Sequence, residues 1–382
     1  MVDLLPRSRF NAGKVGFQSL ILIVLSLMTI SSAKKIGKYS TYLIEPDRKP
    51  LEDFYHSLGG DGWWNRTNWL SQATVCSWAG IACGSDGRVY YIDLSRNDLS
   101  GQLPKTIDQL TELRSMDLSL NRELRGTIPA TIGKLEMLSY LSLPGCRLSG
   151  TLPDAIGNLN KLEYVNLAGN ILKGSIPATI GNMNCLQTIR LTANQISGTL
   201  SEELCRLDNL ATLVLDSNRI FGDIPECLGY LHNLEEITLS MNQLSGSIPA
   251  SLGHLLKLRS LNLSTNQLSS TIPKNIYQLS NLYKLVLSEN RLTGEINYAI
   301  GNLTSVTALF MDNNLLDGTL PSSITNLAEL SILFVNNNQL TGTIPTNLAA
   351  LTSLQLCDLH RNSWSCPIPS LPKACQPPPC NK

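Results

Sequence analysis

The chain has 382 residues, of which 43% are hydrophobic, and it carries 30 basic and 30 acidic side chains. This balanced charge gives no cationic excess for nucleic acid or an anionic membrane, so neither is an expected partner. Its ten cysteines indicate an oxidising compartment.

Residues 1–33 are predicted to form a secretory signal peptide, followed by a spacer over residues 34–49. Three basic residues precede an apolar run from Phe17 to Ile30, and residues 31–33 supply small side chains for cleavage after Ala33. An uncleaved membrane anchor is the alternative, because residues 15–33 approach the ~17–20 residues that span a bilayer. No second apolar run of this kind follows in the sequence.

One sequence word repeats through residues 89–365. It reads L-x-x-L-x-L-x-x-N-x-L-x-G-x-I-P, as in Leu234–Pro249, and ten of its eleven steps are 24 residues long, the other being 25. Its Asn position is filled by Asn97, Asn121, Asn170, Asn194, Asn218, Asn242, Asn266, Asn290, Asn314, Asn338 and Asn362, and once by Cys146. A fixed period in this range predicts a solenoid of about twelve stacked units.

Each part of the word has a physical role. The L-x-L stretch predicts a strand with two inward side chains, and such strands stack ~4.8 Å apart into a parallel sheet. The Asn carboxamide can both donate and accept, so it can pair buried backbone groups of adjacent turns. The Gly predicts a left-handed position, Ile-Pro suits a second short strand, and the tail predicts a helical or 3₁₀ turn.

The word resembles the plant-type extracellular leucine-rich repeat, in which G-x-I-P is the distinguishing half. The resemblance covers roughly residues 50–382 and implies an α/β repeat solenoid, a leucine-rich-repeat superhelix whose parallel sheet lines the concave, ligand-binding face. By this resemblance the chain is similar to the ectodomains of receptor-like kinases and receptor-like proteins and to polygalacturonase-inhibiting proteins. Ser270 replaces the Gly, Ser201 and Asn297 replace the Pro, and Cys366 occupies the last Gly position.

The same resemblance implies capped ends. Residues 50–88 are the expected N-terminal cap, with a Cys76–Cys83 disulfide and with Trp63, Trp64 and Trp69 covering the end of the core. Residues 366–382 are the expected C-terminal Cys- and Pro-rich cap. Cys357 just before this cap and Cys366, Cys375 and Cys380 within it are expected to form two disulfides. Four cysteines allow three pairings, and the sequence does not choose among them.

The remaining cysteines lie within the repeats. Cys205 and Cys227 fall on the convex side of adjacent repeats and are a candidate pair, whereas Cys146 and Cys185 are expected to be unpaired. Zinc is not expected, since the sequence lacks two C-x₂-C pairs at finger spacing. Glycosylation sequons occur at Asn65 and Asn302, on the cap and convex surfaces, and at Asn262, an outward residue of a concave strand.

The outward strand positions yield two candidate contact surfaces on the concave face. The apolar patch consists of Val286, Phe310, Phe334, Ala308, Ile332 and Leu356, with Asp358 beside it. The tyrosine–aspartate cluster consists of Tyr91, Asp93, Ser115, Asp117, Tyr140 and Tyr164. The patch either anchors a partner or stabilises the sheet by cross-strand packing. The cluster either recognises a peptide or glycan by hydrogen bonds or is ordinary solvated surface.

No constellation in the sequence predicts catalysis, a metal or a cofactor. The four histidines are scattered, and only His360 lies at an outward strand position, next to Asp358. Asp93 and Asp117 stack in adjacent strands, and at the inter-strand spacing they are expected to bind a cation or water rather than to cleave a glycoside. The expected function is therefore that of a secreted binding protein, either receptor-like or inhibitory, for an extracellular protein, peptide or cell-wall glycan. Alternatives are a structural or adhesive surface protein, or a membrane-tethered ectodomain if the N-terminal segment is uncleaved.

Overall fold

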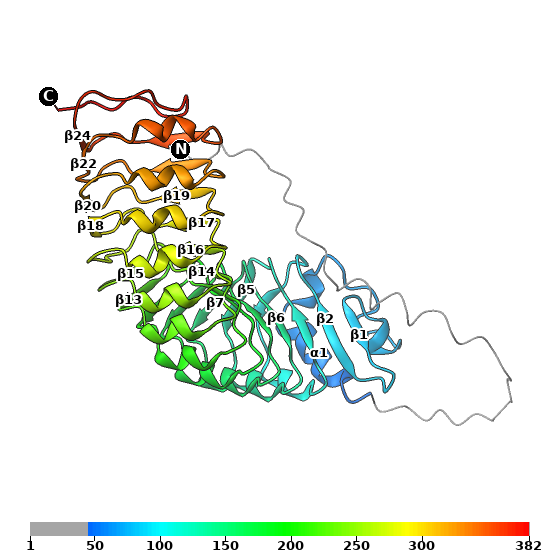
Figure 1. The fold of residues 1–382 in the computed structure, drawn as a ribbon. Coiled ribbons are helices and arrows are strands. Elements are labelled where there is room, and N and C mark those ends of the chain that lie inside the picture. The colour runs from blue at the N-terminus through cyan, green and yellow to red at the C-terminus, as the bar shows by residue number, and fades with distance from the viewer. Residues whose placement is uncertain (1–44, 382) are drawn as a thin grey trace, which may run out of the picture. The chain divides into compact units, whose positions relative to one another are not determined.

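A computed structural model describes residues 45–381; the predicted signal peptide and most of the predicted spacer lie outside these described residues. Residues 45–381 form a stack of repeats that follows a curved path (Figure 1). Each repeat contributes one strand to a continuous sheet on the concave side and a 3₁₀ turn to the convex side. The structure therefore confirms the predicted leucine-rich-repeat solenoid.

The concave sheet has 13 strands, and only its first pair, β1 and β2, is antiparallel. In spatial order the strands are β1 (Ile81–Cys83), β2 (Val89–Asp93), β4 (Ser115–Asp117), β6 (Tyr140–Ser142), β8 (Tyr164–Asn166), β10 (Thr188–Arg190), β12 (Thr212–Val214), β14 (Glu236–Thr238), β16 (Ser260–Asn262), β17 (Lys284–Val286), β19 (Ala308–Phe310), β21 (Ile332–Phe334) and β23 (Leu356–Asp358).

The predicted second short strands form a flanking sheet just before each Ile-Pro. Seven of them are continuous: β3 (Ser100–Gln102), β5 (Glu123–Thr127), β7 (Arg147–Gly150), β9 (Ile171–Gly174), β11 (Gln195–Gly198), β13 (Arg219–Gly222) and β15 (Gln243–Leu244). Two further pairs continue the flank: β18 (Thr293–Glu295) with β20 (Leu315–Asp317), and β22 (Thr341–Gly342) with β24 (Ser363–Trp364).

Helical structure is short and lies on the convex side or in the N-terminal cap. The cap contains α1 (Arg48–Ser57), η1 (Gly60–Gly62) and η2 (Val75–Ser77). The convex 3₁₀ helices are η3 (Lys105–Gln109), η4 (Ala130–Lys134), η5 (Asp154–Asn158), η6 (Ala178–Asn182), η7 (Glu202–Arg206), η8 (Glu226–Tyr230), η9 (Ala250–His254), η10 (Lys274–Gln278), η11 (Tyr298–Asn302), η12 (Ser322–Asn326) and η13 (Thr346–Ala350).

The core follows the repeat register. Leu261 and Leu263, the two inward residues of one L-x-L stretch, are completely buried, and Asn262 between them is half-buried on the outer side. Burial of each such side chain contributes about 1.5–3 kcal/mol. Because ordering one residue's backbone costs about 1–2 kcal/mol, a single repeat cannot stand alone and depends on its neighbours for stability.

The repeated asparagine satisfies buried backbone groups in three directions. Asn218 Oδ1 accepts from Ile196 N at 3.0 Å, in the preceding repeat. Its Nδ2 donates to Leu191 O at 2.9 Å and to Leu215 O at 3.0 Å. Because equivalent bonds recur from repeat to repeat, the carboxamides form a ladder along the solenoid.

The one Cys in the ladder coincides with the one longer repeat. Cys146 has no carboxamide oxygen to accept from the preceding repeat, and its Sγ lies within donating distance of Leu118 O at 3.4 Å and Pro144 O at 3.8 Å. The extra residue lies between Asn121 and Leu124, and it lets Leu124 N bond back to Asn121 O at 3.1 Å. The two irregularities therefore compensate each other.

Each repeat has a residue in the left-handed backbone conformation immediately before its ladder residue, which is the repeated Asn or, once, Cys146. Arg96, Leu120, Ala193 and Met241 are examples with φ between 51° and 58°. This conformation costs about 1–2 kcal/mol for a residue with a Cβ. It is held in place because the N–H groups of these residues bond to the next repeat, as Ala193 N does to Asp216 O at 2.9 Å. The predicted Gly position is also left-handed, including Ser270 with φ 67°.

The two residues that replace the repeat proline cap the following 3₁₀ helices. Ser201 Oγ accepts from Glu203 N at 3.2 Å at the start of η7, and Asn297 Oδ1 accepts from Ala299 N at 2.9 Å at the start of η11. Proline removes a donor at this point, whereas Ser and Asn supply an acceptor for one. Both substitutions thus preserve the turn by a different interaction.

The convex helices pack through a column that is glycine in most repeats. A Cβ at Gly157 or Gly229 would collide with the backbone of the next repeat. Cys205 occupies this column in η7 and is bonded to Cys227 of the next helix, with a Cα–Cα distance of 5.7 Å. At this point in the column a covalent link joins adjacent convex helices in place of the close packing seen at the glycines.

Disulfides and aromatic packing close both ends. Cys76 pairs with Cys83, and the C-terminal cysteines pair as Cys357–Cys375 and Cys366–Cys380. In the N-terminal cap, Trp63, Trp69 and Trp78 are buried in an aromatic cluster with Tyr55. The expectation that Trp64 covers the core is wrong: its side chain is 78% exposed, because the neighbouring Trp63 takes the inward position.

We predict that Asn218→Ala lowers the free energy of unfolding by at least about 3 kcal/mol. The substitution leaves three buried backbone groups without their partner, at about 1–3 kcal/mol each. Chemical denaturation monitored by circular dichroism measures the difference. Cys146→Ala is the matched control, since that position already lacks carboxamide bonds, and it should cost clearly less. Equal losses for both variants would contradict the ladder's role.

We also predict that one of the two free cysteines reacts in the folded protein. Cys146 is buried and Cys185 is exposed. Burial raises the pKa of the Cys146 thiol to about 11, so it stays protonated and unreactive at pH 8. A thiol reagent should therefore count one thiol in the native protein and two after denaturation without reductant. Cys185→Ser should abolish the native signal; reaction of two native thiols would contradict the burial of Cys146.

Candidate binding face

The outward residues of the concave strands form straight columns across the sheet. Strand pairing aligns Asp93 with Asp117 at one end and Val286, Phe310, Phe334 and Asp358 at the other. Residues two positions earlier form a parallel column, which includes Tyr140 with Tyr164 and Ala308 with Ile332. The structure thus brings together the members of each surface singled out in the sequence, while leaving their roles in binding to be proposed.

The apolar patch is partly accessible to solvent. Phe310 and Phe334 are half-buried and meet edge to face, with ring centroids 5.3 Å apart and an interplanar angle of 86°. Val286, Ala308 and Ile332 are also half-buried, and Leu356 at the end of the patch is 47% exposed. The two rings therefore stabilise the sheet through each other and still present apolar surface outward.

A polar pair borders the apolar patch. His360 Nδ1 lies 2.9 Å from Asp358 Oδ1, and the same oxygen accepts from His360 N at 2.9 Å. Asp358 is aligned with Phe334 in the neighbouring strand. The pair gives this end of the face a hydrogen-bonding group beside apolar side chains, a combination that suits a ligand with both kinds of group.

An ion pair crosses the middle of the concave face. Arg190 on β10 reaches over β12 to Glu236 on β14, with an N–O distance of 3.0 Å. Val214 on the intervening strand is only 6% exposed, although its register places it on the outer side of the sheet. Repeat register alone predicts Val214 to be exposed, because it cannot account for a long side chain that covers the neighbouring strand.

The tyrosine–aspartate cluster lies at the N-terminal end of the face. Tyr140 and Tyr164 stack face to face, with centroids 4.6 Å apart and an interplanar angle of 6°. Tyr91 is 36% exposed and its hydroxyl donates to Asp93 Oδ2 at 3.3 Å. Burial raises the pKa of Tyr91 and Tyr140, and the negative charges of Asp93 and Asp117 raise it further.

The three sequon asparagines differ in accessibility. Asn65 and Asn302 are exposed, on the cap and at the end of η11. Asn262 is half-buried on the concave strand β16, and its Oδ1 accepts from Ser264 N at 3.1 Å and Ser264 Oγ at 2.8 Å. A glycan on Asn262 would project from the middle of the concave face, between the two candidate surfaces.

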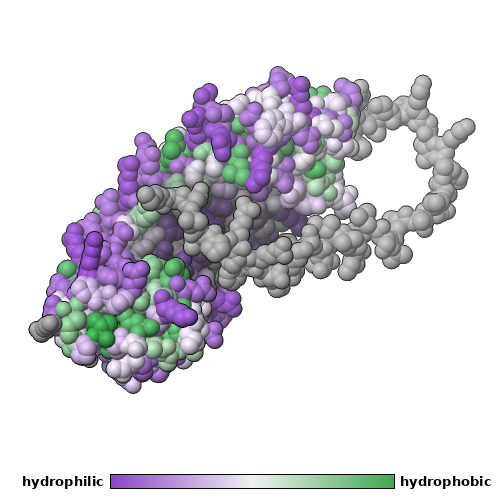
Figure 2. Space-filling model, turned by 90° about the horizontal axis from the view of Figure 1, so that it is seen from above, coloured by the Kyte–Doolittle hydropathy of each residue, from purple (hydrophilic) through white to green (hydrophobic). Residues whose placement is uncertain are grey.

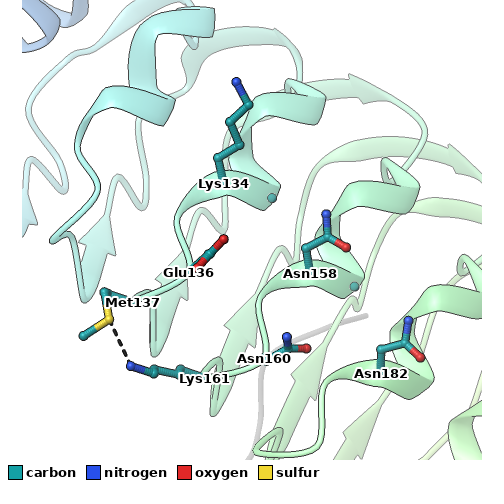
Figure 3. Close-up of a pocket in the computed structure, with 9 residues that line it drawn as sticks. Lys134, Glu136, Met137, Asn158, Asn160, Lys161 and Asn182 are labelled. Carbon is teal, nitrogen blue, oxygen red and sulfur yellow. Dashed lines mark hydrogen bonds between the residues drawn. The ribbon is translucent and has the colours of Figure 1, made fainter.

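A groove on the convex side has no counterpart in the sequence predictions. Figure 3 shows side chains from successive convex turns around it, with Lys161 directed toward Met137. Its lining comprises Gly133, Lys134, Glu136, Met137, Gly157, Asn158, Asn160, Lys161 and Asn182. The glycines that allow close helix packing also leave this space open. Lys134 is already paired with Asp108 at 2.8 Å, and the lining offers no buried polar group for a ligand.

Figure 2 shows one face of the described residues, on which hydrophilic and apolar areas are interspersed. Apolar side chains gather most densely at the lower-left end of this view. No helix within the described part is long and apolar enough to cross a bilayer. Nor do these residues contain a group of three or more His, Cys, Asp or Glu side chains arranged to hold a metal ion.

Comparison with known protein families identifies the type of repeat. A model of the leucine-rich repeat region matches residues 154–290, and a model of the single leucine-rich repeat matches residues 88–110, 137–159, 281–303 and 329–351. The chain belongs to the leucine-rich-repeat family. The matched families are repeat families rather than catalytic ones. The similarity to plant receptor-like and inhibitor proteins expected from the G-x-I-P word is confirmed by the individual leucine-rich-repeat relatives.

Among those relatives, phytosulfokine receptor 1 of Arabidopsis thaliana is 36% identical over 107 residues, which are 27% of this chain and 10% of the receptor. Polygalacturonase inhibitor 1 of Oryza sativa subsp. japonica is 34% identical over 100 residues, 25% of this chain and 29% of the inhibitor. The matches thus span well under two thirds of these proteins.

A solved structure of the Arabidopsis receptor kinase HAESA, in complex with the peptide hormone IDA and a co-receptor, shares the fold. It superposes with a TM-score of 0.70 at 32% identity, covering 84% of this leucine-rich-repeat chain and 58% of the HAESA chain. The leucine-rich-repeat structures similar to this protein thus include a peptide hormone receptor with its ligand and co-receptor bound.

Proposed function

We propose that this leucine-rich-repeat protein is a secreted, non-catalytic binding protein that recognises an extracellular protein or peptide through its concave face. The observation that carries the proposal is the apolar patch, where Phe310 and Phe334 remain partly accessible beside other outward apolar side chains. Aromatic side chains at exposed positions commonly anchor partners, and apolar groups left in water favour a surface that covers them. The similarity to a peptide hormone receptor supports the same role.

The arrangement of the face supports a ligand rather than a substrate. Several of its polar groups are engaged with one another, as in Asp358 with His360 and Arg190 with Glu236. A long rigid sheet with fixed columns of side chains is preorganised for an extended or flat partner. Such preorganisation reduces the ordering cost of association.

Secretion is supported by the cysteine chemistry. Four disulfides are formed among residues 45–381, at both ends and between adjacent convex turns. Structural disulfides of this kind persist in oxidising compartments. The predicted signal peptide lies outside the described residues, and an uncleaved segment there would instead tether the same binding face to a membrane.

We predict that a Phe310→Glu, Phe334→Glu double variant loses its partner. Burying each ring in an interface contributes about 1.5–3 kcal/mol, so two charged replacements should weaken binding by at least about 100-fold. A pull-down from extracellular fluid with wild type and variant, read by mass spectrometry, identifies the partner and measures its loss. The matched control is Tyr230→Glu, Tyr298→Glu, which places two charges on the convex side at residues 59% and 67% exposed.

The control separates the competing explanations. Loss of the partner in the concave variant alone supports recognition by the apolar patch. Capture of the same partners by both variants would assign the aromatic pair to sheet packing and favour a structural or adhesive protein, in which the regular surface tolerates single changes. Thermal unfolding of each variant shows that the comparison is made on folded protein.

We further predict that the secreted protein carries N-linked glycans. Because Asn65 and Asn302 are exposed, treatment with an N-glycanase should lower its mass, and Asn65→Gln with Asn302→Gln should remove most of the shift. Any remaining shift should disappear with Asn262→Gln. An unchanged mass after N-glycanase treatment of protein from a eukaryotic secretory host would contradict the predicted use of the sequons.

A further inference from the structure

Two stacked columns of the tyrosine–aspartate cluster place aromatic and acidic groups side by side. Tyr91, Ser115 and Tyr140 are aligned on successive strands β2, β4 and β6, with Asp93 and Asp117 in the adjacent column. The small Ser115 therefore separates two tyrosines, each about 4.8 Å away along the sheet. Tyr164 stacks on the far side of Tyr140 and fixes its ring, since the two rings are parallel.

The carboxylates of this cluster lack a cationic partner. The concave strands carry four carboxylates, Asp93, Asp117, Glu236 and Asp358. Glu236 pairs with Arg190 and Asp358 with His360, whereas no Lys or Arg of residues 45–381 lies within 4.0 Å of Asp93 or Asp117. Asp117 is the least satisfied, because among described residues only the backbone Ser119 N, at 2.8 Å, donates to it.

The negative charge of the cluster faces its tyrosines. Asp93 and Asp117 are half-buried in register on neighbouring strands, so their charges add over the same small area. Tyrosine rings attract a cation through their π faces, and a carboxylate beside the ring strengthens this attraction. Calcium fits less well, because it needs six to eight oxygen ligands and this area supplies two carboxylates.

We infer that the tyrosine–aspartate cluster binds a positively charged side chain, lysine or arginine, of the protein or peptide ligand. The inference rests on the proposed function and adds the chemistry of a second contact. An ammonium or guanidinium group would pair with Asp93 and Asp117 while its aliphatic stem packs on Tyr91 and Tyr140. The ligand would then meet acidic and aromatic groups at one end of the face and the apolar patch at the other.

The spacing of the two surfaces sets a minimum length for one ligand that reaches both. Eight strand-to-strand steps separate β4, with Asp117, from β19, with Phe310. At about 4.8 Å per step this is roughly 38 Å along the sheet. An extended chain covers about 3.3–3.6 Å per residue, so its basic and apolar residues would lie about 11–12 positions apart.

The test uses a phage-displayed library of random peptides of about 16 residues, long enough to reach both surfaces, selected against three proteins. These are wild type, an Asp93→Asn, Asp117→Asn double variant, and the charge-matched control Asp154→Asn, Asp208→Asn, which changes two exposed residues outside the concave strands. Wild type and control should enrich lysine and arginine, and the double variant should not. A synthetic copy of an enriched peptide should bind the double variant at least about tenfold more weakly and lose most of its salt dependence. Apolar enrichment should persist in all three.

The outcomes separate the inference from the proposed function. Basic residues enriched equally by the double variant overturn the inference. Selection of apolar residues alone by wild type overturns it while leaving peptide recognition intact. Failure of wild type to select any peptide overturns both. Loss of neutral oligosaccharide binding by the double variant on a glycan array, without a change in peptide selection, assigns the cluster to sugars and also overturns the inference.

Discussion

The fold depends on the pairing of backbone groups at the inward turn after each concave strand. At that turn the chain leaves the sheet, and its N–H and C=O groups are removed from water, where an unpaired group costs about 1–3 kcal/mol. A single carboxamide solves this for two repeats at once, as Asn218 does between Ile196 N and the carbonyls of Leu191 and Leu215. The ladder therefore ties each repeat to the next, while one continuous hydrophobic core runs along the stack.

The irregular repeats show how strictly this requirement is met. Cys146 cannot accept the incoming N–H, and the one added residue in the preceding repeat redirects Leu124 N to Asn121 O. Ser201 and Asn297 replace a proline and cap the turn that follows. Cys205 stands where glycine allows close packing and is bonded to Cys227 instead. In each case a lost interaction is replaced locally, so the stack continues without a break.

The sequence predicts the fold closely because one word encodes strand, turn and helix in every unit. The period establishes both sheets and the outward columns, including the alignment of Phe310 with Phe334. The features that the repeat period does not predict arise from contacts outside the repeated word. The left-handed residue before each Asn carries no fixed residue type, from Arg96 to Met241. The burial of Val214 depends on Arg190 crossing a strand, and the C-terminal pairing depends on a non-repeating segment.

The binding role is harder to derive than the fold because the repeated word specifies the inward residues but not the outward ones. Inward positions are constrained by the ladder and the core, whereas outward positions of the sheet are free to vary with little effect on either. Departures from a plain polar face are thus informative: the half-buried Phe310 and Phe334 at one end and the unpaired Asp117 beside Tyr140 at the other. Neither departure is part of the asparagine ladder or of the inward core. A carboxylate without a cationic partner and a partly exposed aromatic surface are both stabilised when a complementary partner covers them. These two features therefore favour recognition over a purely structural role.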